Sequence, residues 1–167
     1  MISFKRWRLS LLCLQLTICT AWLSSCEKID LYERTVAIPK NEWSSRFAPA
    51  FSFEISDTAS SYQVYIILRH DDRYNYNNIW LNLVAQGPDG KKVPFTQIEM
   101  PLADKEKGWL GSGMADLYEH RIPITLDPQK FSFNRKGTYR FTLAHMMREN
   151  PLQHVLNVGL RLERKAQ

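Results

Sequence analysis

Residues 51–56 read Phe51-Ser52-Phe53-Glu54-Ile55-Ser56, an alternation of large apolar and polar side chains. Successive side chains of an extended strand point to opposite faces, so the apolar residues of this segment line one face. Alternating aromatic and β-branched residues are typical of a half-buried strand. The segment therefore predicts a strand with one face in a hydrophobic core.

The same alternation recurs along most of the chain. It follows a short first strand at 36–38, and it is found at 62–69, 79–85, 92–100, 118–124, 138–146 and 158–163. Gly87-Pro88-Asp89-Gly90 predicts a tight turn between two of these strands. Pro123 lacks an N–H to donate, which predicts that the end of its strand lies at a sheet edge.

Helical patterning is weak after Cys26. Only residues 103–107 and 146–153 favour one or two helical turns, while 108–113 reads as a Gly-rich loop. Some eight strands at this spacing predict an all-β fold, a single antiparallel β-sandwich domain of jelly-roll type.

Length and composition bound the answer further. The chain has 167 residues, of which 44% are hydrophobic and 23% charged. These values are typical of a globular protein and leave room for one domain, so disordered chains and large α/β enzymes are excluded.

The N-terminal residues have the order of an export signal. Lys5, Arg6 and Arg8 precede an apolar stretch at 9–23, which ends in Leu23-Ser24-Ser25-Cys26. This pattern predicts a bacterial lipoprotein signal that is cleaved between Ser25 and Cys26, with lipid attached to the Cys26 thiol. An uncleaved membrane anchor is the alternative, but fifteen residues are short for a span of about 20.

Cleavage divides the chain into three expected parts and changes its chemistry. Residues 1–25 are the signal peptide, 26–41 the lipidated tether with a first short segment, and 42–167 the β-sandwich domain. Cys13 and Cys19 leave with the signal, so no disulfide or thiolate site is expected. Loss of three basic residues reduces 22 to 19, against 17 acidic ones. A nucleic-acid partner is therefore not expected.

Catalytic patterns are weak. Ser112 lies between two glycines, but Leu110 stands where a hydrolase serine needs the first glycine. His70, with Asp71 and Asp72 beside it, has no second histidine at metal-ligand spacing. We therefore expect no enzyme, no metal and no cofactor.

One segment combines planar and amide side chains between two strands. Tyr74, Tyr76, Asn78 and Trp80 lie in it, and Trp109 lies in the Gly-rich loop. Aromatic rings that stack and side-chain amides that form two hydrogen bonds are suited to binding a sugar, a peptide or a partner protein. These residues are therefore the candidate binding surface. The structural alternative is that asparagines fill turns and the rings pack against the sheet edge.

The chain resembles the gliding-motility lipoprotein H (GldH) family of the Bacteroidetes, from the Cys26 motif almost to the C-terminus. The matching pieces occur in order: Trp43, 51–57, Tyr62, Leu68-Arg69, 74–81, 108–113, 137–141, Met147-Arg148 and 158–160. The resemblance implies a non-catalytic envelope lipoprotein with Cys26 as its lipid-bearing residue. It implies partners among other gliding-motility lipoproteins and the type IX secretion apparatus, at the periplasmic face of the outer membrane or at the cell surface. Glu27 and Lys28 after the cysteine leave the choice of membrane and leaflet open. The alternative is an envelope carbohydrate- or peptide-binding module.

Overall fold

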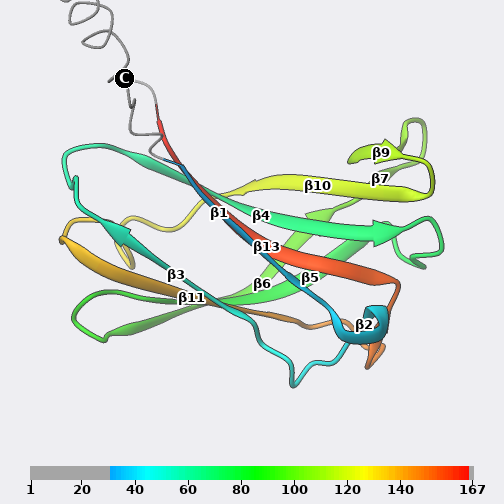
Figure 1. The fold of residues 1–167 in the computed structure, drawn as a ribbon, viewed down its shortest axis with the longest axis horizontal. Helices are drawn as coiled ribbons and strands as arrows, with labels where there is room; N and C mark the ends of the chain where they lie inside the picture. The colour runs from blue at the N-terminus through cyan, green and yellow to red at the C-terminus, as the bar shows by residue number, and fades with distance from the viewer. Residues whose placement is uncertain (1–30, 166–167) are drawn as a thin grey trace, which may run out of the picture.

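The computed structural model describes residues 31–165, which form two packed antiparallel sheets (Figure 1). The five-stranded sheet has the order β1 (Leu31–Ala37), β13 (Val155–Arg164), β4 (Tyr62–Asp71), β10 (Leu117–Ile124) and β9 (Ser112–Met114). The four-stranded sheet has the order β3 (Ala50–Ile55), β11 (Gly137–His145), β5 (Asn78–Gln86) and β6 (Lys92–Pro101). The predicted all-β sandwich is confirmed.

The long strands pair in a nested order. β5 pairs with β6 through the turn at 87–91, and around this hairpin β4 pairs with β10, β3 with β11 and β1 with β13. Successive pairs alternate between the two sheets, so the described chain behaves as one long double strand wrapped around the core. This is the arrangement of a jelly roll.

Short elements close the ends of the sandwich. A 3-10 turn, η1 (Pro39–Asn41), leads into β2 (Glu42–Trp43), which pairs with β12 (Leu152–Gln153). A second small hairpin joins β7 (Ala103–Asp104) to β8 (Gly108–Trp109). Within the described residues there is no α-helix.

Three expectations from the sequence are corrected. Residues 103–107 are not helical, because the Asp104 carboxylate accepts the backbone N–H groups of Glu106 and Lys107 and closes a hairpin turn. Residues 146–153 lack a helix because β5 takes part of their backbone, the Met146 N–H donating to the Trp80 carbonyl. The Gly-rich segment 108–113 is partly strand, with β8 and the start of β9 in it.

The start of the five-stranded sheet differs from the sequence prediction, whereas its edge agrees with it. The first strand begins at Leu31, earlier than the predicted residue 36, and β1 pairs with β13 over its full length. Pro123 pairs with Tyr65 on one side only, since β9 reaches no further along β10 than Glu119. Its predicted position at a sheet edge is confirmed.

The core lies between the sheets, where the alternating residues meet. Phe51, Phe53 and Ile55 of the opening segment are at most 6% exposed, and they pack with apolar side chains of β4, β5, β11 and β13. The Phe53 ring stacks on the ring of Phe141 in the neighbouring strand β11, with 5.4 Å between the ring centroids. Burial of these large side chains supplies most of the folding free energy.

The outer face of the five-stranded sheet carries a chain of ion pairs. Glu33 of β1 binds Arg161 and Arg121, and Glu119 binds Arg121 and Arg69. Beneath the network lies Ile67, which is only 1% exposed although it points away from the core. These charges therefore satisfy one another within the sheet and cover an apolar residue.

Candidate functional site

Aromatic and imidazole rings gather at the end of the sandwich where β4 finishes, at the right of Figure 1. They come from β4, the connection 72–77, β8 and β10, and their ring centroids lie between 4.4 and 6.3 Å apart. We call this group the ring cluster; its members are His70, Tyr74, Tyr76, Trp109, Tyr118 and His120.

A turn at the end of β4 brings the first tyrosine back over the sandwich. The Asp71 side chain accepts the backbone N–H of Arg73 at 2.9 Å, and the Asp71 carbonyl accepts that of Tyr74 at 3.2 Å. Aspartate commonly closes turns in this way. The Tyr74 hydroxyl then donates to the Asn78 carbonyl at 3.1 Å, which fixes the connection between β4 and β5.

The two buried histidines bond to each other. His70 Nδ1 lies 2.7 Å from the Asp71 carbonyl oxygen, so this nitrogen carries a proton and donates it. His70 Nε2 is then an acceptor for the N–H of His120 Nε2, which lies 2.9 Å away. Two neutral imidazoles satisfy this arrangement, and a proton added to His70 Nε2 would place two N–H groups face to face.

Burial keeps both imidazoles neutral. Desolvation lowers the pKa of His70, although its contacts with Asp71 oppose the change. Desolvation, together with the neighbouring His70, lowers the pKa of His120 to about 4. Since a charged imidazole is costly without water, the pair acts as a structural hydrogen bond near neutral pH.

The Asp71 carboxylate is the charged group nearest the histidines along the chain. Burial alone would raise its pKa, but hydrogen bonds from Arg73 and His154 outweigh burial and lower it. Asp71 Oδ2 lies 3.0 Å from the Arg73 guanidinium and 3.1 Å from His154 Nδ1. The carboxylate is therefore committed to structural contacts.

Trp109 enters the ring cluster from β8. Its ring centroid lies 4.4 Å from that of His70 and 5.6 Å from that of Tyr118. After it the chain must pass close to β10, and Gly111 allows this approach, because a Cβ there would lie 2.6 Å from the Glu119 carbonyl oxygen. Glycine at this position therefore holds the β8–β9 connection against the sheet.

The structure brings together three of the five residues predicted for a binding surface. Tyr74, Tyr76 and Trp109 share the ring cluster, while Asn78 and Trp80 point outward from β5. Tyr74 is 4% exposed, so it supports the surface from beneath; the other four are half-buried. Their role in binding stays a prediction.

Sequence reasoning missed His70, His120 and Tyr118 as parts of this site. His70 and His120 are fifty positions apart and meet only because β4 and β10 pair with Tyr118 opposite His70. The alternation of side chains along β4 and β10 could have found the two histidines, since each occupies an inward position of an otherwise apolar strand face.

The ring cluster offers hydrogen bonds and stacking. Its imidazoles bond each other, and the adjacent Asp71 carboxylate accepts hydrogen bonds from Arg73 and His154. Among residues 31–165, no group of three or more His, Cys, Asp or Glu side chains is placed to hold a metal ion.

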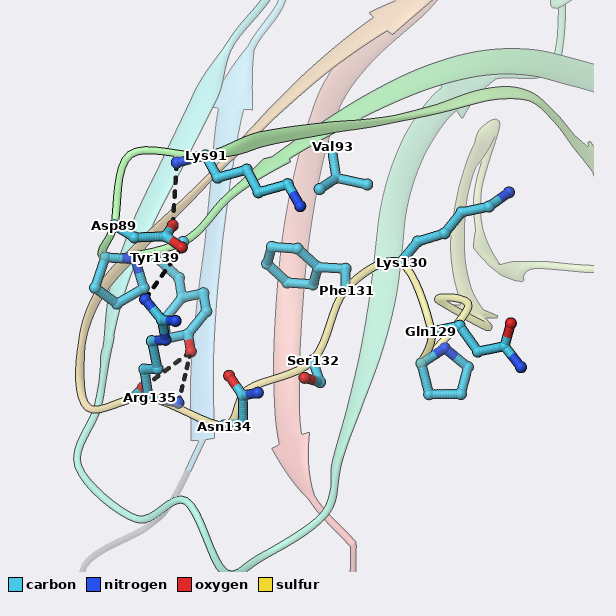
Figure 2. Close-up of a pocket in the computed structure, with 13 residues that line it drawn as sticks. Asp89, Lys91, Val93, Gln129, Lys130, Phe131, Ser132, Asn134, Arg135 and Tyr139 are labelled. Carbon is cyan, nitrogen blue, oxygen red and sulfur yellow. Dashed lines mark hydrogen bonds and ion pairs between the residues drawn. The ribbon is translucent and has the colours of Figure 1, made fainter.

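Figure 2 shows a second feature, a shallow hollow between the β5–β6 turn and the loop 128–135. The Arg135 guanidinium pairs with Asp89 at 3.2 Å, and the Tyr139 hydroxyl donates to the Arg135 carbonyl at 2.9 Å. These groups satisfy one another, so the hollow is a weaker candidate than the ring cluster.

Comparison with known proteins identifies the family. The sequence profile of the GldH lipoprotein family matches residues 30–162, which is most of the chain. This chain belongs to the GldH lipoprotein family. Two curated relatives are similar along their length: a gliding motility lipoprotein GldH homolog of Christiangramia forsetii is 26% identical over 84% of this chain and 88% of its own. Gliding motility lipoprotein GldH of Flavobacterium johnsoniae is 25% identical over 86% of this chain and 90% of its own.

Solved structures show more distant likeness. A carbohydrate-binding module specific for non-crystalline cellulose aligns with a TM-score of 0.44 and 15% identity, covering 80% of this chain and 73% of its own. The VP2 subviral particle protein of infectious bursal disease virus aligns with a TM-score of 0.36 and 14% identity, covering 81% and 33%.

Membership of the GldH family makes this chain a membrane-anchored lipoprotein of the cell envelope. The predicted cleavage site at Ser25 and lipidation site at Cys26 lie outside the described residues. In the part of the chain that is described, no helix is long and apolar enough to span a bilayer.

Proposed function

We propose that this protein is a non-catalytic envelope lipoprotein that works through protein contacts with other gliding-motility lipoproteins and with the type IX secretion apparatus. The observation that carries the proposal is the GldH family match over residues 30–162, together with relatives named as gliding motility lipoproteins. Lipid on Cys26 would hold the domain at the periplasmic face of the outer membrane, since several acyl chains anchor a protein almost permanently.

The chemistry of the ring cluster is compatible with a role without catalysis. Its two histidines are buried, neutral and bonded to each other, and the adjacent Asp71 carboxylate is held by Arg73 and His154. A general base needs access to a substrate proton, and both imidazoles are buried and bonded to each other.

Complementation of a deletion strain tests the proposal. Deleting the gene should abolish or impair type IX secretion, and wild-type protein should restore it. Cys26→Ser should fail to restore it and should yield an unlipidated precursor by mass spectrometry, because acyl transfer needs the thiol. The matched control Ser112→Ala removes the one serine set between glycines and should restore secretion fully. Full secretion in the deletion strain, or loss of secretion in Ser112→Ala, would contradict the proposal.

A second candidate is an envelope carbohydrate- or peptide-binding module. Half-buried Trp80 on the outer side of β5 is the observation that favours it, because a partly exposed indole ring can stack on a sugar. A glycan-array screen of the lipoprotein in detergent, with Trp80→Ala as control, separates the two. Binding that Trp80→Ala abolishes, with secretion intact in the deletion strain, would favour the module.

A further inference from the structure

Three exposed apolar side chains project from the β8–β9 connection and the β9–β10 turn. Leu110 is 48% exposed, Met114 84% and Leu117 43%, and they are three of the four large apolar residues exposed in the described part of the chain. Met114 and Leu117 face each other across the turn as a cross-strand pair. We call these three residues the apolar tip.

The backbone beneath the apolar tip is held firmly. The Leu110 N–H donates to the Leu102 carbonyl at 2.8 Å, and the Asp72 N–H donates to the Asp116 carbonyl at 2.9 Å. Gly113 lies so close to the Tyr118 ring that a Cβ there would be 2.8 Å away. The tip therefore presents its side chains on a fixed support, and little ordering entropy is left to lose on contact.

The apolar tip and the start of the described chain lie along the same long side of the molecule in Figure 1. Figure 1 places the start of β1 at the upper left and the β9–β10 turn at the upper right. Leu31 follows Cys26 by five positions, a reach of about 17 Å at most for an extended chain. A membrane along the upper side of this view would therefore meet both the anchor and the tip.

Tethering favours lipid as the occupant of the tip. Three side chains suffice for a bilayer contact when an anchor already holds them near the surface, because tethering raises the effective concentration. Asp116 lies in the turn between Met114 and Leu117, and its carboxylate limits contact to the headgroup boundary.

We propose that the apolar tip, Leu110, Met114 and Leu117, is a second membrane contact that lays the sandwich along the bilayer carrying its lipid. This inference rests on the anchor at Cys26 proposed above. It sets the orientation of the domain, with the outer side of the four-stranded sheet turned toward the aqueous space.

Spin labelling of the full-length lipoprotein in vesicles of phosphatidylethanolamine and phosphatidylglycerol tests this. Met114→Cys carries the nitroxide, and Ser52→Cys, exposed on β3, is the control; Cys26 is blocked by its acyl chains. The collision rate with oxygen relative to a water-soluble nickel chelate should rise several-fold at position 114 on transfer from detergent to vesicles, and should stay unchanged at 52. A further change, Leu117→Asp, should abolish the rise at 114.

Two results would overturn the inference. Equal nickel accessibility at 114 and 52 in vesicles means that the tip lies in water. Immobilisation at 114 only after envelope proteins are added means that the tip binds a protein. Mass spectrometry of the same samples reports acylation: if acyl chains are absent, the anchor itself is wrong, and if they are present with a water-exposed tip, only the orientation is wrong.

Discussion

At the scale of single residues, three histidines determine how the protein responds to acid. His70, His120 and His145 are at most 4% exposed, and burial lowers the pKa of each. The unfolded chain binds protons on these side chains near pH 6.5, while the folded chain resists them. The free energy of unfolding therefore rises with pH wherever the unfolded state holds more protons.

We expect the folded state to lose stability as the pH falls from about 6.5 to about 4. With the pKa of His120 at about 4, this residue alone accounts for a loss on the order of 3 kcal/mol across that window. Thermal unfolding followed by circular dichroism at half-unit pH steps measures it. Paired carboxylates such as Glu119, whose pKa is lowered by the hydrogen bond from Arg69, add their loss at lower pH.

His120→Gln separates the histidine pair from the other groups. The Gln amide can still donate toward His70 Nε2 but takes up no proton, so the slope of stability against pH between 6.5 and 4 should become shallower. An unchanged slope in this variant would show that the His70–His120 pair does not govern acid sensitivity.

At the scale of elements, the β8–β9–β10 region depends on close backbone approach. We expect Gly111→Ala to destabilise the fold by roughly 1–3 kcal/mol, because the new methyl group would meet the Glu119 carbonyl oxygen at 2.6 Å. Chemical denaturation measures the change. Ser112→Ala, on the exposed next residue, should stay within about 0.5 kcal/mol of the wild type. Equal stability of both variants would contradict the packing described for this connection.

Two tyrosines of the ring cluster should behave differently although they are two positions apart. Tyr74 is 4% exposed, so Tyr74→Ala should cost about 3–5 kcal/mol of stability, as truncation of a buried aromatic residue does. Tyr76 is half-buried and its hydroxyl bonds Glu149, so Tyr76→Ala should cost much less. Melting temperatures of both variants test this, and a larger drop for Tyr76→Ala would refute it.

At the scale of the whole molecule, short sequence patterns predict the strands. The ring cluster forms only when strands far apart in the sequence pair with each other. The alternation at 51–56 and the turn at 87–90 are local, and the structure confirms both, with the Gly90 N–H donating to the Gly87 carbonyl at 3.0 Å. The helical turn expected at 103–107 is wrong because Asp104 satisfies the turn backbone with its side chain. Contacts such as His70 with His120 depend on strand register over fifty positions, which no short window contains.

The nested jelly roll has a spectroscopic consequence. Residues 27–167 should give a far-ultraviolet circular dichroism spectrum dominated by β-structure, since the described residues contain no α-helix. A helix content near one third, as in an average globular protein, would contradict the fold.

Refolding after dilution from denaturant should take milliseconds to seconds, because β1 must find β13 at the other end of the chain.

Crosslinking in the native membrane tests whether this lipoprotein works through protein neighbours in the envelope. A photo-reactive amino acid at half-buried Tyr76 is activated in cells that carry the lipidated protein, and crosslinked partners are identified by mass spectrometry, with exposed Ser52 as the comparison position. We expect gliding-motility lipoproteins or components of the type IX secretion apparatus to be enriched over unrelated envelope proteins. Recovery of envelope glycan alone, or of no protein enriched at either position, would contradict it.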